Sequence, residues 1–129
     1  MTVGLHTVNL ANKWLDMLGA SAFTAPAVTA IKLHTGDPGA AGTTAASAET
    51  TRKALTWSAA ASGSKGITTT LPTWLWAAGN ETITHFSVWD STTAGNFLFS
   101  GAFTVSKSVT NGDTLNVLTL TIAHTPLAA

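Results

Sequence analysis

Histidine, carboxylate and hydroxyl side chains are the groups of this chain that could bind a metal or take part in catalysis. The four histidines lie far apart, without the HxH or HExxH spacing that pre-forms a metal site; they are His6, His34, His85 and His124. His34 and Asp37 are close enough in sequence to share a cation, but a strand-end histidine beside a turn-forming aspartate is the commoner arrangement. We therefore expect no bound metal and no other cofactor.

The residues that nucleophilic or acid–base catalysis needs do not form a recognisable set. The chain has no cysteine and no Gly-x-Ser-x-Gly elbow to position a serine beside a base. Its six carboxylates are scattered, and Asp90 and Asp113, which could meet in space, are expected to cap turns. No glycine-rich loop precedes a helix to hold a phosphate. The sequence therefore predicts a protein that is not an enzyme.

The composition predicts a surface with few charges. Six basic and six acidic residues give a formal net charge of zero, and 9% of the residues are charged, against about 25% in typical globular proteins. A free monomer usually depends on net charge for solubility, so we expect a chain that binds copies of itself or a larger assembly. The only adjacent basic pair is Arg52-Lys53, which disfavours nucleic-acid binding. No apolar run could span a bilayer and the N-terminus lacks signal-peptide features, so we expect no membrane contact and synthesis in the cytoplasm.

One helix and a series of strands are expected in a single domain, residues 1–129. Apolar side chains recur at helical spacing near the N-terminus, at Val8, Ala11, Leu15 and Leu18, and Trp14 widens the same stripe. This predicts an amphipathic helix over residues 8–18 that lays its apolar stripe on a sheet or on a partner, the sheet being the commoner role. Strand patterns separated by turn signals, without intervening helices, then indicate a mainly antiparallel β-sandwich, jelly-roll-like, over about residues 27–124.

Two of the later strands show clear alternation. In one, Phe86 and Val88 should share a face, with His85, Ser87 and Trp89 on the other. In the next, four large side chains are expected to line one face: Phe97, Phe99, Phe103 and Val105.

The first strand runs into a turn and then a long loop. Asp37 can accept hydrogen bonds from downstream backbone N–H groups, Pro38 fixes φ near −65°, and Gly39 tolerates positive φ. Residues 35–51 contain almost no large side chain, so we expect a mobile surface loop. Loops of this length are often functional, and contact with a neighbouring subunit is predicted for Asp37, Pro38 and the following Arg52.

Trp74-Leu75-Trp76 is the most informative apolar cluster. In a strand both tryptophans point the same way and Leu75 points the other way. They could lie in the core, or on an exposed edge, which Pro72 favours, where aromatic residues anchor subunit interfaces. Carbohydrate binding by the same side chains would need polar neighbours, and the neighbours are mainly Ala and Thr.

Several segments together resemble one family. The stretch Leu33-His34-Thr35-Gly36-Asp37-Pro38-Gly39 is similar to a pattern of small structural proteins of tailed bacteriophages. Segments that match the same layout are Ala11 to Asp16, Trp57 to Ala60, Thr84 to Asp90 and Gly112 to Leu115. The resemblance spans nearly the whole chain and implies a virion component, either a minor capsid or decoration protein or a minor tail or fibre protein.

The function expected from this resemblance is structural. Many copies would bind the capsid exterior as symmetric clusters, such as trimers, and stabilise contacts between major capsid subunits. The candidate contacts are the loop and the tryptophan edge, through Trp74, Leu75, Trp76, Asp37, Pro38 and Arg52. A minor tail or fibre component that contacts the host is the first alternative, and a small cell-wall hydrolase is the second.

Overall fold

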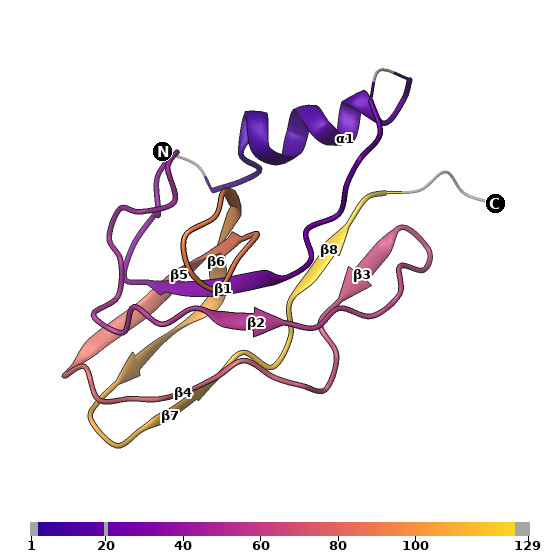
Figure 1. Ribbon diagram of the computed structural model, residues 1–129. Coiled ribbons are helices and arrows are strands. Elements are labelled where there is room, and N and C mark those ends of the chain that lie inside the picture. The colour runs from indigo at the N-terminus through magenta and orange to yellow at the C-terminus, as the bar shows by residue number, and fades with distance from the viewer. Residues whose placement is uncertain (1–2, 20, 126–129) are drawn as a thin grey trace.

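The computed structural model describes residues 3–19 and 21–125, and it is mainly β with antiparallel sheets and one short N-terminal helix (Figure 1). This confirms the predicted fold class. The helical part is a π-helical turn, Thr7–Ala11, followed by α1, Asn12–Asp16. The strands are β1 (Thr29–His34), β2 (Lys53–Leu55), β3 (Ser64–Gly66), β4 (Thr73–Leu75), β5 (Glu81–Trp89), β6 (Phe97–Val109), β7 (Thr114–Asn116) and β8 (Thr121–Ala123).

The strands form one larger sheet and two small ones. The four-stranded sheet has the order β2-β1-β5-β6, and β3 pairs with β8 while β4 pairs with β7, all antiparallel. In the view of Figure 1, α1 lies at one end of the molecule and β4 and β7 lie at the other. Among the described residues, no helix has the length and apolar character needed to cross a membrane.

One face of the four-stranded sheet forms the core. The register pairs Ile31 with Val88 and Leu33 with Phe86, and all four side chains are buried. Phe86 and Val88 therefore share a face as the alternation predicted. The same buried cluster contains Trp74 and Trp76, which come from β4 and its end, so the β4–β7 pair closes the core from the other side.

Irregularities in β6 make one prediction wrong. Val88 pairs with Phe99, whereas the next residue, Trp89, pairs with Phe97, so Leu98 is an extra residue in β6. Such a bulge reverses the faces of the residues on its two sides. Phe97 consequently packs against Trp89, with ring centroids 5.6 Å apart, and does not share the face of Phe99.

The second half of β6 also departs from the predicted alternation of side chains. Phe103 keeps its contact with the core, since its ring centroid lies 5.1 Å from that of Phe86. Val105, expected on the same face, is 78% exposed.

The N-terminal segment holds the start of the helix against β6. The His6 N–H donates to the Leu98 carbonyl at 2.7 Å, and the Ser100 N–H donates to the Gly4 carbonyl at 2.9 Å. The Asn9 side-chain amide donates to the Phe97 carbonyl at 2.8 Å. These bonds fix the first helical turn, and they do not reach α1.

Alanine substitutions at the neighbouring positions 75 and 76 should lower the free energy of unfolding by unequal amounts, because one side chain is exposed and the other is buried. Trp76 is 1% exposed and Leu75 is 72% exposed. Trp76→Ala should lower the free energy of unfolding by about 3–5 kcal/mol, because a large cavity remains. Leu75→Ala should change it by no more than about 0.5 kcal/mol. Urea unfolding of both variants measures this, and equal losses would contradict the assignment of Trp76 to the core.

Candidate interaction surface

Both tryptophans of the predicted interface lie in the core, which corrects the exposed-edge interpretation. The Trp74 indole N–H donates to the Thr51 carbonyl at 2.8 Å, and the Trp76 indole N–H donates to the Gly79 carbonyl at 2.8 Å. Each indole is therefore buried with its polar atom satisfied, as buried tryptophans usually are. Leu75 points outward between them, and a partner contact at Leu75 stays a prediction.

Asp37 and Pro38, the loop residues predicted to contact a neighbouring subunit, make contacts within their own chain. The Asp37 carboxylate accepts the Gly39 N–H at 2.8 Å, which confirms its turn-forming role, and Gly39 has a φ of 70°. Pro38 is buried, and its carbonyl accepts the Thr44 N–H at 2.9 Å. Contact of Asp37 or Pro38 with a neighbouring subunit stays a prediction.

We call residues 35–51 the strap: Gly42 and Thr44 contact side chains on the face of the sheet opposite to the core, and residues 45–47 return along β1, bonded to Thr35 and Leu33. His34 at the end of β1 is fully buried beneath it. Its Nδ1 donates to the Thr44 carbonyl of the strap at 2.8 Å, since a carbonyl can only accept. Its Nε2 then accepts from the Ser87 hydroxyl at 2.8 Å, and the Ser87 oxygen accepts the Trp89 indole N–H at 2.8 Å. This assignment of the tautomer follows from the network.

Further contacts fix the strap along its length. Glu81 of β5 accepts from the Ser47 hydroxyl and from the Ala48 N–H. Gly42 lies so close to Phe97 that a Cβ there would be 2.5 Å from a ring carbon, so only glycine fits. The mobility predicted for residues 35–51 stays a prediction, and these contacts are what any motion would have to break.

Arg52, another candidate, is bound within the chain. Its guanidinium carbon lies 3.8 Å from the centroid of the Trp89 ring, in cation–π geometry. The same guanidinium donates to the carbonyls of Ser91 and Ala94, in the turn between β5 and β6. Arg52 therefore stabilises that turn from the face that the strap covers.

The residues considered for chemistry have structural partners. The Asp90 carboxylate accepts the Asn96 N–H at 2.6 Å, and the Asp113 carboxylate accepts the Thr110 N–H at 2.9 Å. Both therefore cap turns, as predicted. Within residues 3–19 and 21–125, no three His, Asp or Glu side chains come together as a possible metal site.

The apolar stripe of the helix is the largest departure from the predicted packing. Val8 is 64% exposed, Leu15 is 66% exposed and Leu18 is 88% exposed. The prediction that this stripe packs on the chain's own sheet is therefore wrong for these three residues, whereas Trp14, which widens the stripe, is partly buried and packs against the core cluster. Leu10 is the buried residue of the π-helical turn, and α1 buries none of its residues. We call Val8, Ala11, Leu15 and Leu18 the helix face.

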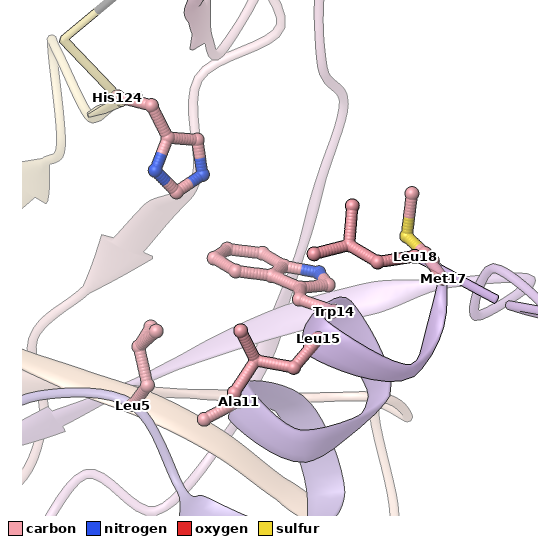
Figure 2. A pocket seen from close by; sticks show the side chains of 7 residues that line it. All are labelled: Leu5, Ala11, Trp14, Leu15, Met17, Leu18 and His124. Atoms are coloured by element: carbon pink, nitrogen blue, oxygen red, sulfur yellow. The ribbon is translucent and has the colours of Figure 1, made fainter. Parts of the chain in front are cut away.

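An open apolar cavity of about 740 Å³ lies beside the helix face (Figure 2). The residues that line it are Leu5, Ala11, Trp14, Leu15, Met17, Leu18 and His124. Figure 2 shows the Trp14 indole between the helix and the His124 ring, and the two ring centroids are 5.2 Å apart in an edge-to-face contact. None of the lining residues is Asp, Glu, Lys or Arg, so this surface suits an apolar partner rather than an ionic one.

The sequence contained the signal for the helix face but not for its exposure. The spacing of apolar residues identified the stripe correctly. Whether the sheet buries this stripe depends on how the helix is connected to the sheet. The connection over residues 21–28 consists mainly of small residues, and only Phe23, Pro26 and Val28 could anchor it. Phe23 and Pro26 are partly buried and Val28 is 43% exposed, so none of the three is fully buried.

The chain was compared with known protein families and with curated proteins. A family model described as "Podophage GP4 fiber I protein gp80" matches residues 6–125. This range includes the helix, the strap and the strands from β1 to β8. No curated protein matches the chain.

The buried His34 predicts a pH dependence of stability. Burial lowers the pKa of His34 below its ordinary value of 6.5, which the bond to the Thr44 carbonyl partly offsets. The unfolded chain therefore binds more protons than the folded chain as the pH falls through 6.5, so the free energy of unfolding should decrease there. Urea unfolding between pH 7.5 and about 5 measures the slope. His34→Gln should flatten it, and an unchanged slope in that variant would contradict the assignment.

Proposed function

The chain belongs to the podophage GP4 fiber I protein gp80 family, a family of phage virion proteins, and from this premise we propose that it is a structural component of a virion fibre. The family membership agrees with the resemblance to phage virion proteins. In the proposed role the chain works by assembly rather than by catalysis. The helix face is the surface through which it binds copies of itself or other virion proteins.

The observation that carries the proposal is a helix most of whose apolar residues have no cover within the chain, Trp14 being the residue of α1 that packs against the core. α1 buries none of its residues, while Leu15 and Leu18 project from it. Helices this short are marginal in water, because nucleation is unfavourable and packing of an apolar face supplies most helical stability in proteins. Full burial of a leucine side chain contributes about 1.5–3 kcal/mol. A neighbouring subunit that covers the helix face would therefore stabilise both the helix and the assembly.

Attachment to the capsid exterior in many copies is the alternative role. The same apolar surface could strengthen contacts between major capsid subunits, and the low charge of the chain suits either setting. The description of the matching family names a fibre protein, which is why we favour the fibre.

Copy number distinguishes the two roles. Quantitative mass spectrometry of purified virions, with the major capsid protein as internal standard, should give few copies of this chain per particle. Antibody labelling in electron micrographs should then mark the tail or its fibres. A copy number comparable to that of the capsid subunits or their clusters, with label over the head, would overturn the fibre assignment in favour of decoration.

The helix face can be tested separately from the location. The double substitution Leu15→Ser and Leu18→Ser should lower incorporation into virions by at least about 100-fold, because two leucines lose their burial in the interface. The melting temperature of the free chain should change little, since both residues are exposed. Val28→Ser, at a position 43% exposed outside the helix face, is the matched control and should be incorporated normally.

A variant at Leu75 tests the other exposed candidate. If Leu75→Ser prevents incorporation while the helix-face variant does not, the interface lies on β4 and the assignment to the helix is wrong.

The same preparations can be assayed on cell-wall polymer, and hydrolysis by the purified chain would revive the enzyme alternative.

A further inference from the structure

The strap is attached to the sheet mainly by polar contacts. Its buried residues are Pro38, Gly42 and Ser47, and none of them carries a large side chain. The Ser47 hydroxyl donates to the Glu81 carboxylate of β5. Segments with few buried apolar contacts open locally at a lower free energy than the whole fold. The strap therefore has the properties of a segment that can open while the sheet beneath it stays paired.

Ala45 marks the point where the strap turns back along β1. Its φ is 47°, in the left-handed region that residues with a Cβ seldom adopt. Such a conformation persists only where the surrounding contacts hold it. Two backbone bonds do so: the Thr35 N–H donates to the Ala45 carbonyl at 2.9 Å, and the Ser47 N–H donates to the Leu33 carbonyl at 3.1 Å. The closed strap is thus held by hydrogen bonds against a strained residue.

The hydrogen bonds of His34 are those that a proton would disturb. Its Nδ1 donates to the Thr44 carbonyl, and its Nε2 accepts from the Ser87 hydroxyl. A proton added at Nε2 would make this nitrogen a donor as well. The Ser87 oxygen, which already accepts the Trp89 indole N–H, would then accept from both rings, and its own hydroxyl proton would lose its acceptor.

Protonation would also place a full charge where His34 is fully buried, which is costly without a negative partner. Burial is the main cause that lowers the pKa of His34, and the neighbouring Lys32 and His85 lower it further. His85 lies directly opposite His34 in the register of β1 and β5. The carbonyls of Thr44 and Ala45 favour the charged form and offset part of this effect.

The carboxylates near the strap bind other groups. Glu81 accepts from the strap at Ser47 and Ala48, and Asp37 accepts from the Gly39 N–H. Both ring nitrogens of His34 bond neutral groups instead. The other charged or titratable groups on the segments around the strap are His6, Glu49, Arg52, Lys53 and Asp90.

We propose that the strap is a pH-sensitive lid, which lifts from the end of β1 when His34 takes up a proton. Residues 36–47 would separate from the sheet, while β1, β5 and β6 stay paired. Opening would bring the charged imidazole into water and uncover the Phe97 ring, against which Gly42 now lies. This ring is 6% exposed in the closed form, so mild acid would expose an aromatic surface that is hidden at neutral pH. The inference does not depend on where the chain sits in the virion.

Native-state hydrogen exchange at single amides tests the lid. The amides of Thr35 and Ser47 report its opening, because their bonds join the strap to itself and to β1 at the turning point. Between pH 7.5 and about 5, their protection factors should fall by up to about tenfold per pH unit below 6.5. Free aspartate and glutamate titrate near pH 4, so the response in this range comes from histidine.

Urea below the unfolding transition separates local opening from global unfolding. Global unfolding also releases His34, so amides of β5 that exchange by that route share the pH trend. Their exchange should accelerate with urea, because global unfolding exposes much surface. Exchange of the Thr35 and Ser47 amides should be faster than that of β5 and nearly independent of urea. Equal protection and equal urea dependence in the strap and in β5 would overturn the inference.

Two glutamine variants identify the group that responds. His34→Gln should abolish the pH response of the strap amides, since glutamine does not titrate. His85→Gln, at the position opposite, is the matched control and should keep most of the response. A response that survives His34→Gln, or one that disappears in His85→Gln, would show that His34 is not the trigger. If His34→Gln does not fold, the wild-type chain and His85→Gln still decide, because a urea-independent opening without a pH response would also contradict the lid.

Discussion

The need to cover both faces of the four-stranded sheet governs the rest of the structure. One face carries Ile31, Leu33 and Phe86, and the β4–β7 pair closes it with two buried indoles. The other face carries the aromatic side chains Trp89 and Phe97 together with buried polar groups.

The strap covers that second face, and a chain of hydrogen bonds holds it there. The chain runs from the Trp89 indole through Ser87 and His34 to a strap carbonyl. Every buried side-chain nitrogen and oxygen atom among the described residues has a hydrogen-bond partner. Burying these polar groups in an otherwise apolar layer costs little free energy, because each of them has a hydrogen-bond partner. The hydrogen bonds also fix the position of the strap. The helical segment contributes Leu10 to the core cluster and Trp14 against its edge, and its other apolar residues are not needed to cover the sheet.

The sequence predicted those features that follow from local periodicity. Alternation placed Phe86 and Val88 on one face, and it placed Trp74 and Trp76 together. It did not tell which face of β4 the rest of the chain covers, because that depends on pairing with β7, far along the sequence. The bulge at Leu98 could not be predicted from the sequence either, because a bulge depends on the partner strand and leaves no local pattern. The helix face was found by its spacing, and only its partner was misassigned.

The central claim is that α1 acquires its stability from another molecule, and hydrogen exchange measures this directly. Backbone amides of residues 12–18 should exchange rapidly in the free monomer, because Trp14 alone in this segment is even partly buried. The same amides should be strongly protected in assembled virions, while the amides of β5 are protected in both states. Equal protection of residues 12–18 in the monomer and the virion would contradict the account, because the helix would then be stable without a partner.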